Sequence, residues 1–349
     1  MLSIIIPTFN RGDSLKLTLD SLVKQEFPVN KFEVLIVDNG STDNTKIVSE
    51  NFISSHQHHN IRYIYEPVPG LLSGRHRGAV ESKGDILVYI DDDIDADSHW
   101  LEAIENSFSD PAVQLVGGRN LPKYESEPPE WLEWFWQKHS RGKYCSYLSL
   151  LDFGEQVFEI DPNFVWGLNF SIRKEKLFEL GGFHPDCISQ NLQCFQGDGE
   201  TGLTIKIKKL KYKTIYQPQA LIFHRISAAR MTYDYFDKRF YYQGVCDSYS
   251  EIRAKGNNWL KFRLKNLLIS WKNDFKALLK VVSFKELTTD NISNQTESKL
   301  TEKQILEERF KKAYQAGFCF HQDAVLKNRK IFMWVVKDNY WDYKLPELN

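Results

Sequence analysis

The sequence has no run of about 20 uninterrupted apolar residues, so no membrane-spanning helix is expected. Its first residues, MLSIIIPTF, have no basic stretch before a short apolar run that a proline ends. This pattern predicts a first strand rather than a secretory signal peptide. Net charge is also nearly absent, because 45 Lys and Arg residues balance 46 Asp and Glu residues. The balance argues against a nucleic-acid partner, and any anionic ligand must be held by local groups.

Cysteine is scarce and forms no CxxC pair; the five residues are Cys145, Cys187, Cys194, Cys246 and Cys319. An odd number of unpaired cysteines is typical of reduced thiols in a cytoplasmic protein, and a zinc site is not expected. The sequence also lacks a GxxxxGK(S/T) loop, which disfavours an ATPase or GTPase.

Short apolar runs alternate with helical patterns in the first third of the 349 residues. The runs at 2–6, 34–37, 61–65, 86–90 and 113–116 predict buried strands. Between them, helices are expected near 15–23, after a Ser41 or Thr42 cap, at 77–82 and at 100–108. This alternation predicts an α/β fold with a mostly parallel sheet that is covered by helices on both faces.

The rest of the chain follows a different pattern. Residues 120–230 are irregular and rich in aromatics, and residues 231–349 look helical. Residues 259–285 form a basic amphipathic stretch with a single acidic residue, Asp274. Such a stretch could lie on an anionic membrane surface, or it could be a helix packed on the domain with a solvated basic face. The polar run 288–303 predicts a linker.

Polar residues follow three of the predicted strands. They are Pro7, Thr8, Phe9, Asn10 and Arg11 after the first, Asp38 and Asn39 after the second, and Asp91, Asp92 and Asp93 after the fourth. Ligands of open α/β sheets bind outside the carboxyl ends of the strands. We therefore expect these three strand ends to form one site.

The triple aspartate is the most informative of the three segments. Adjacent like charges after a buried strand are unfavourable unless a cation compensates them, and oxygen ligands suit Mg²⁺ or Mn²⁺. The alternative is a solvated acidic start of a helix. A calcium loop is excluded, because Ala96 stands where that loop requires glycine and a strand rather than a helix precedes it.

The order of motifs resembles the GT-A fold glycosyltransferases of family 2. The resemblance depends on IIIPTFNR, VLIVDNGSTDNT, GLLSGRHRGAVESKGDILVYIDDD, GLNFSIRKEKLFELGGF, GDGETGLTIKIKK and LIFHR. It covers roughly the first 230 residues. It implies a Rossmann-like GT-A domain at 1–230 for nucleotide-sugar binding and catalysis, with an acceptor side at about 120–230, and a mainly helical C-terminal region at 231–349.

The resemblance also implies roles for individual residues. Those that would bind the nucleotide sugar are Pro7, Thr8, Asn10, Arg11, Asp38, Asn39, Arg75, Asp91 and Asp92. Within this set Asp38 would read the edge of the base, while Asp91 and Asp92 would face the ribose and the sugar. Asp93 would bind the Mn²⁺ or Mg²⁺ that bridges the phosphates, and His224 would join the ion or touch the diphosphate. Without the family pattern, a lone histidine after an apolar run is more often structural.

The carboxylate base of the family precedes a helix that matches residues 201–207 here. Glu200 takes that position, but the acidic pair of the family is interrupted by Gly199, so Asp198 is an alternative base. Both carboxylates could instead cap the helix. A base must remove the proton of the acceptor hydroxyl during attack, and a base opposite the leaving group implies inversion at the anomeric carbon.

On the acceptor side, the resemblance points to Trp166, Gly167 and Asn169. Trp166 could stack on a sugar, or it could be an ordinary core residue. A second aromatic segment, 128–136, places Trp131, Trp134 and Phe135 on one helical face, which predicts packing or a lid.

We therefore expect an inverting, metal-dependent glycosyltransferase for surface-polysaccharide or cell-wall synthesis. The donor would be a nucleotide diphosphate sugar, by default a UDP-sugar, and the acceptor a hydroxyl of a glycan or lipid-linked glycan. The expected location is cytoplasmic, with peripheral contact at the inner face of the membrane if the basic stretch binds lipid. The alternatives are a catalytically inactive nucleotide-sugar-binding module and a sugar-nucleotide nucleotidyltransferase. The latter would have a glycine-rich basic loop after the first strand.

Overall fold

The computed structural model describes residues 1–256, 258–264 and 301–348. The chain divides into two compact units. The first contains Met1–Arg239 and Lys337–Leu345, and the second contains Phe240–Val336 and Pro346–Asn349. The first unit is thus built from two separate stretches of chain, whereas the sequence pattern predicted a single boundary after residue 230. That boundary stays a prediction.

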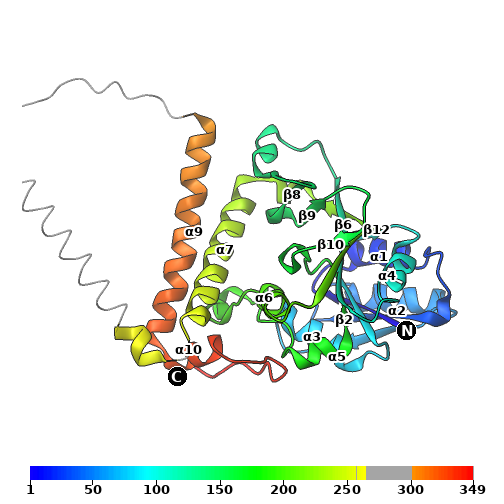
Figure 1. Cartoon of the computed structure of the whole chain (residues 1–349), viewed down its shortest axis with the longest axis horizontal. Coiled ribbons are helices and arrows are strands. Elements are labelled where there is room, and N and C mark those ends of the chain that lie inside the picture. The colour runs from blue at the N-terminus through cyan, green and yellow to red at the C-terminus, as the bar shows by residue number, and fades with distance from the viewer. Residues whose placement is uncertain (257, 265–300, 349) are drawn as a thin grey trace, which may run out of the picture. The chain divides into compact units, whose positions relative to one another are not determined.

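Four parallel strands form one half of the sheet in the first unit (Figure 1). Their order is β3 (Ile61–Tyr65), β2 (Phe32–Asp38), β1 (Leu2–Thr8) and β4 (Ile86–Ile90). All seven residues of β1 and of β2 are buried, as expected for parallel strands that are covered on both faces. The predicted alternation of strands and helices is confirmed here.

The other half of the sheet is largely antiparallel. β11 (Asn169–Arg173) runs antiparallel to both β4 and β6 (Val113–Tyr124), and β12 (Lys213–Ile226) runs parallel to β6. Shorter strands complete it: β5 (Ile94–Ala96), β7 (Gln137–His139), β8 (Gly142–Cys145), β9 (Leu150–Asp152) and β10 (Phe158–Glu159). The sheet is therefore mixed rather than mostly parallel. The sequence could not predict this, because a hydrophobic run indicates a buried strand but not the direction of that strand.

Helices cover both faces of the parallel half. On one face, α1 (Gly12–Leu22), α2 (Thr45–Ser55) and α4 (Trp100–Ser107) share a core with strand residues such as Ile4 and Ile36. On the other face lies α3 (Leu71–Glu81), where Gly78 packs so closely on Ile5 that an added Cβ would lie 2.3 Å from it. The remaining helices of this unit are α5 (Lys174–Glu179) and α6 (Thr201–Lys209).

Short 3₁₀ helices connect these elements. They are η1 (Val29–Lys31), η2 (Glu130–Phe135), η3 (Ser146–Leu148), η4 (Pro162–Phe164), η5 (Gln190–Phe195) and η6 (Ala228–Met231). In η2, Trp131 is buried, whereas Trp134 is 39% exposed. The predicted packing therefore holds for Trp131 but does not extend to Trp134, although residues three positions apart are eclipsed in a 3₁₀ helix such as η2.

Two helix starts also differ from the prediction. α2 begins at Thr45 after Asn44, and the side chain that accepts from its first N–H is Asp43 rather than Ser41 or Thr42. α3 begins at residue 71, six residues before the predicted start, because Gly70 adopts a φ of +112° and turns the chain into the helix.

The second unit is helical. α7 (Tyr233–Ala254) enters it from the first unit, and α9 (Glu302–Lys327) and α10 (Arg329–Val335) follow. Thr301 and Gln304 form a capping box at the start of α9. Within the described residues, no helix combines the length and hydropathy needed to cross a bilayer. The predicted basic stretch and linker lie mostly outside the described residues. All five cysteines are free thiols.

Candidate active site

A cavity of about 340 Å³ lies at the carboxyl ends of β1, β2 and β4. Six of the nine residues predicted to bind the nucleotide sugar line it: Pro7, Thr8, Arg11, Asn39, Asp91 and Asp92. The strand ends therefore meet in one cavity, as the parallel register of β1 with both neighbours requires.

Asp92 is held by the segment that follows β1. Its carboxylate accepts a hydrogen bond from the Thr8 hydroxyl at 2.7 Å and pairs with the Arg11 guanidinium at 2.6 Å. Burial nevertheless raises the pKa of Asp92 to about 6, and the neighbouring carboxylate of Asp93 adds to this rise. Asp92 is thus a buried acid that changes its charge in a range close to neutral pH.

Asp93 has a different environment. One oxygen lies 2.9 Å from Arg11 and 2.8 Å from Arg230. Burial opposes the charge on Asp93, but His224, Arg230 and Arg11 hold its pKa well below the usual range. Its other oxygen, Oδ1, is buried and has no hydrogen-bond partner among the described residues. Asp93 is therefore a charged carboxylate with one oxygen left for a further cation.

Asp91 faces the cavity without a hydrogen bond from any of the described residues. Burial and the nearby Asp93 raise its pKa, while Arg75 opposes the rise. The three adjacent aspartates are consequently not equivalent, and Asp91 is the one whose carboxylate remains available to a ligand in the cavity.

His224 is arranged like a metal ligand. Its Nδ1 lies 2.8 Å from the Leu148 carbonyl oxygen and must donate to it, so Nε2 carries the lone pair. Nε2 accepts from Arg230 at 2.7 Å and lies 3.5 Å from Asp93 Oδ1, which is too long for a good hydrogen bond. A histidine that donates its other nitrogen to a carbonyl is typical of metal sites.

These residues fit Mg²⁺ or Mn²⁺ if the substrate supplies further ligands. Among the described residues, no group of three or more His, Cys, Asp or Glu side chains could hold an ion by itself. Mg²⁺, however, commonly takes one or two carboxylates and completes its shell with phosphates and waters. Asp93 Oδ1 suits that role as it stands, and His224 Nε2 would suit it once Arg230, which now donates to it, moves away.

The predicted base lies at the start of α6 beside a buried arginine. Glu200 Oε2 pairs with Arg75 at 3.1 Å, and Glu200 Oε1 accepts from the Gly167 N–H at 3.0 Å. Gly167 has no room for a side chain, because an added Cβ would lie 1.9 Å from Arg75 Nη2. Both oxygens of Glu200 are therefore oriented by the surrounding chain, while its side chain keeps 21% exposure.

Asp198, the alternative base, is occupied elsewhere. It is buried and lies 2.7 Å from His184 Nδ1. Between the two acids, Gly199 has a φ of +57° and packs on Asp186, where an added Cβ would lie 2.8 Å from Oδ2. This left-handed turn points the two carboxylates to different surroundings, and Glu200 is the one better placed to meet an acceptor.

Arg75 connects the two acidic clusters. Burial opposes its charge, but the carboxylates of Glu200, Asp91 and Asp186 surround it and raise its pKa above the usual value. Arg75 itself does not line the cavity; it lies buried behind it. The acids after β4 and the acid before α6 thus act on one guanidinium.

Three of the residues predicted to bind the donor have mainly internal contacts. Asp38 is buried and accepts from Tyr63 and from the Ser41 N–H, so its base-reading role stays a prediction. Asn10 bonds to the Thr42 N–H and joins the two loops. Asn39 lines the cavity, and its amide also bonds to the Val68 carbonyl and the Gly70 N–H.

Two residues predicted on the acceptor side, Asn169 and Trp166, differ in their exposure. Asn169 is only 2% exposed, and its amide bonds to Trp100, Asn120 and the Ala220 carbonyl. Every polar atom of the Asn169 side chain is thus used in the core, and its expected contact with an acceptor stays a prediction. Trp166 is partly exposed and donates to the Asn163 carbonyl, so it remains a candidate for the acceptor wall.

Two residues near the site, Arg230 and Asp186, were not predicted from the sequence. Arg230 lines the cavity and pairs with Asp93, and Asp186 lies next to Gly199 and Arg75. Both are in irregular segments where periodicity gives no signal. The position of Arg230, six residues after His224, is meaningful only once η6 has folded back.

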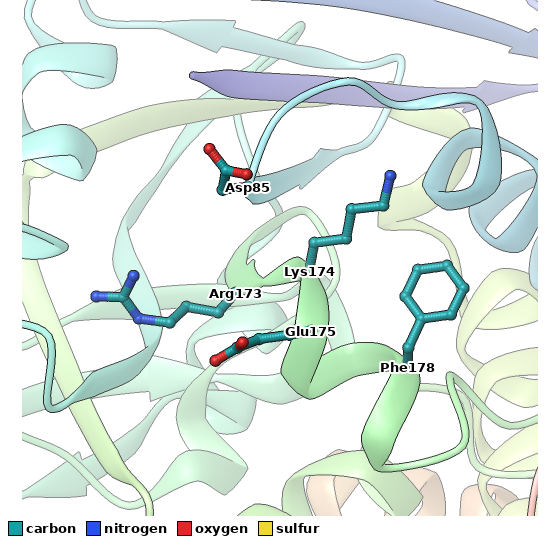
Figure 2. A pocket seen from close by; sticks show the side chains of 5 residues that line it. All are labelled: Asp85, Arg173, Lys174, Glu175 and Phe178. Carbon is teal, nitrogen blue, oxygen red and sulfur yellow. The ribbon is translucent and has the colours of Figure 1, made fainter.

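A second hollow, of about 570 Å³, lies at the opposite end of β4 (Figure 2). Figure 2 shows the side chains of Asp85, Arg173, Lys174, Glu175 and Phe178 around it. Arg173 already donates to three backbone carbonyls, and Lys174 to one. Its cations are thus used in the fold, and the smaller cavity at the strand ends is the candidate active site.

Comparisons with known proteins agree with this assignment. The family model for glycosyl transferase family 2 matches residues 3–178. Glycosyltransferase AglE of Haloferax volcanii is 35% identical over 116 residues, which is 33% of this chain and 38% of that protein. Glucosyl-dolichyl phosphate glucuronosyltransferase of the same organism is 25% identical over 287 residues, which is 76% of this chain and 86% of that protein.

Among solved structures, the mannosyltransferase PcManGT of Pyrobaculum calidifontis, in complex with GDP-Man and Mn²⁺, has a similar fold. The TM-score is 0.53 at 17% identity, over 98% of this chain and 84% of that one. The likeness supports the predicted architecture of a mixed sheet, flanking helices and a helical C-terminal region. The chain therefore has the GT-A fold and belongs to glycosyl transferase family 2.

Proposed function

We propose that the chain is an inverting, metal-dependent glycosyltransferase that uses a nucleotide diphosphate sugar, with a UDP-sugar favoured. The acceptor would be a hydroxyl of a glycan or lipid-linked glycan in surface-polysaccharide or cell-wall synthesis. Two comparisons support this proposal. One relative is named a glucosyl-dolichyl phosphate glucuronosyltransferase, and PcManGT was solved with GDP-Man and Mn²⁺.

The walls of the cavity suit a nucleoside diphosphate. Phe9, at 55% exposure, and the neighbouring Pro69 and Leu71 offer an apolar surface for a base. Arg11 and Arg230 supply positive charge for the phosphates, and the available carboxylate of Asp91 can accept hydrogen bonds from ribose or sugar hydroxyls.

Asp93 and His224 would hold Mn²⁺ or Mg²⁺. Such an ion, when bound, stabilises the negative charge that develops on a departing nucleoside diphosphate. Arg11 and Arg230 now neutralise Asp93, so both guanidinium groups are already where that charge would develop.

Glu200 would act as the base. Its carboxylate is held by Arg75 and by the Gly167 N–H, so an acceptor hydroxyl that approaches it meets an oriented oxygen. Glu200 would remove the proton of the hydroxyl as the hydroxyl attacks the anomeric carbon from the side opposite the diphosphate. Such an attack inverts the configuration at that carbon. Asp198 is paired with His184 and would support the turn before α6.

The observation that carries the proposal is that Arg75, which pairs with Glu200, also interacts electrostatically with Asp91, so the two acidic clusters lie around one guanidinium. The direct test is Glu200→Gln. We expect this variant to bind donor as the wild type does and to lose transfer by about 10²-fold or more, as removal of a general base does. Full transfer activity would move the base to another residue.

The metal role is tested by the thermal stability of the protein with UDP, GDP or dTDP, each with and without Mn²⁺. The matching nucleotide should raise the melting temperature mainly when Mn²⁺ is present, because a ligand that binds only the folded state stabilises it. Equal shifts without metal would contradict the role of Asp93. A nucleotidyltransferase would release pyrophosphate instead of a nucleoside diphosphate, and an inactive binding module would release neither.

A further inference from the structure

The hairpin formed by β7 and β8 has two different faces. In its register Gln137 lies opposite Tyr144 and Lys138 lies opposite Lys143. On the first face, His139 stacks on Phe153 with 4.4 Å between ring centroids, and the Tyr144 hydroxyl donates to Gln137. Because side chains alternate along a strand, this inward face leaves the two lysines on the other side.

The second face combines lysines with a tryptophan. Lys143 Nζ lies 4.5 Å from the centre of the Trp136 ring, and Lys138, across the strand pair, is exposed. Arg141 occupies the turn and is exposed as well, and its guanidinium lies 4.2 Å from the centre of the Phe158 ring, on the side of His139 and Phe153. The face therefore carries two lysines and an aromatic ring within a few residues, with a third cation, Arg141, at the adjacent turn.

This arrangement is unfavourable for the hairpin alone. Like charges directly opposite each other destabilise a strand pair. Among the described residues, none of the three cations forms an ion pair with a carboxylate, and there is no Asp or Glu from residue 134 to 151. Lysine on an edge strand prevents sheets from pairing, which can explain Lys138 on β7. It does not explain Lys143 on β8, an inner strand, or the tryptophan beside it.

We propose that Trp136, Lys138, Arg141 and Lys143 form a docking surface for the anionic headgroups of a lipid bilayer. Tryptophan prefers the interface between water and hydrocarbon, and each Lys or Arg near an anionic surface strengthens binding severalfold. Headgroups with a net negative charge complement the lysine pair, which has no acidic partner, whereas zwitterionic headgroups do not.

The place of this surface relates it to the proposed acceptor, and to that extent the inference depends on the proposed function. On the inward face, the Tyr144 ring lies 6.4 Å from the Trp166 ring. Trp166 precedes Gly167, whose N–H donates to Glu200. Docking of the hairpin would bring a lipid-linked acceptor toward the proposed base.

The test is sedimentation of the full chain with vesicles of phosphatidylcholine alone or of phosphatidylcholine mixed with phosphatidylglycerol. We expect binding only to the anionic vesicles, and about tenfold or greater weakening in Lys138→Gln/Lys143→Gln. Trp136→Ser should weaken binding to the same vesicles. The matched control, Lys24→Gln/Lys83→Gln, removes the same charge from exposed lysines elsewhere and should bind as the wild type does.

Wild-type-like binding of the hairpin variant would overturn the proposal and place any membrane contact elsewhere, for example in the basic stretch at 259–285. Equal binding of the wild type to both kinds of vesicle, or no binding to either, would overturn it too. The stabilisation by nucleotide and Mn²⁺ is measured on the same variants without vesicles. If nucleotide and Mn²⁺ do not stabilise the wild type, the proposed function is contradicted, but the result of the vesicle experiment stays valid.

Discussion

Asp91, Asp92 and Asp93 are adjacent in the chain, yet each has a different set of partners. Asp92 is held by Thr8 and Arg11, Asp93 by Arg11 and Arg230, and Asp91 faces the cavity. Buried like charges repel each other, so this segment is stable only where cations surround it. At the scale of single residues, the buried aspartates lower the stability of the fold, and the same charges attract a cation and, through it, phosphates.

The substitution Asp92→Asn tests whether the buried charge of Asp92 lowers the stability of the fold. The folded-state pKa of Asp92 is raised to about 6 from 3.8, so the folded protein binds the proton more tightly than the unfolded chain does. The ionised group therefore destabilises the fold above pH 6, and this penalty disappears as the pH falls below about 4. Without divalent cations, we expect Asp92→Asn to be more stable than the wild type by about 1–3 kcal/mol at pH 8.

The measurement is denaturant unfolding of both proteins across this pH range. The difference in the free energy of unfolding should shrink toward zero near pH 4, where the wild-type carboxyl is protonated too. A difference that does not change with pH would show that the charge on Asp92 is not its cause.

Gly167→Ala tests the orientation of the base. The new Cβ would lie 1.9 Å from Arg75 Nη2, so the guanidinium must move away from Glu200. A displacement of this size can reduce kcat by about 10²-fold, while donor affinity should stay near that of the wild type. Gly154→Ala is a control for backbone strain without a clash, because Gly154 has a φ of +82° and only a carbonyl oxygen at 4.0 Å approaches that site; it should lose stability and keep kcat. An unchanged kcat in Gly167→Ala would show that the position of Arg75 does not matter for catalysis.

At the scale of elements, β12 holds the acidic loop in place. Arg225, on this strand, donates to the carbonyls of Ile94 and Ser14 and to the Thr18 hydroxyl, and it pairs with Asp95. One side chain therefore joins the loop after β4 to α1. The loop keeps its shape although it carries several like charges.

The substitution Arg225→Lys should remove most of these hydrogen bonds while keeping the positive charge. Lysine keeps the charge but lacks the planar fork, so we expect a loss of about 2–4 kcal/mol in the free energy of unfolding, together with weaker donor binding. Arg173→Lys is a matched control, since Arg173 also donates to three backbone carbonyls but at the far end of β11. It should lose stability and keep donor affinity. If both variants bind donor equally, Arg225 has no special role at the site.

At the scale of the whole molecule, residues 337–345 return to the first unit and pack beside α3. The Tyr340 carbonyl lies 3.1 Å from His76 Nδ1, and the Trp341 ring stacks on Phe178 at 4.1 Å. Tyr343 donates to Glu66, which in turn accepts from the Val68 N–H. The C-terminal segment thus supports the loop that leads to Pro69 and Gly70 in the cavity wall.

Tyr343→Phe should therefore weaken donor binding without changing the chemistry. Loss of one hydrogen bond, about 1 kcal/mol, corresponds to an increase of about fivefold in the donor KM, with kcat nearly unchanged. Tyr212→Phe removes a similar bond, to Glu179 on the surface, and should change neither value. Equal effects of the two substitutions on donor KM would contradict the link to the cavity.

Much of the donor side could be predicted from the sequence, because its residues follow strands that are hydrophobic and short. A parallel strand that ends in polar residues places them at a known edge of the sheet, which is why Thr8, Arg11 and Asp92 were found. Arg230 and Asp186 were missed because they lie in irregular segments. The core network of Asn169 was not predicted, because sequence does not distinguish an amide that faces a ligand from one that bonds within the core.

By itself, the sequence determined the alternation of strands and helices in the first third, the acidic segment after β4 and the family motifs, since these depend on local patterns of hydrophobicity and charge. Only the tertiary structure decided the direction of β11, the separate surroundings of the three aspartates and the return of residues 337–345. These features depend on contacts between residues far apart in the chain. Arg75 illustrates the difference: the motif that contains it could be identified from the sequence, but its burial and its pairing with Glu200, 125 residues away, could not.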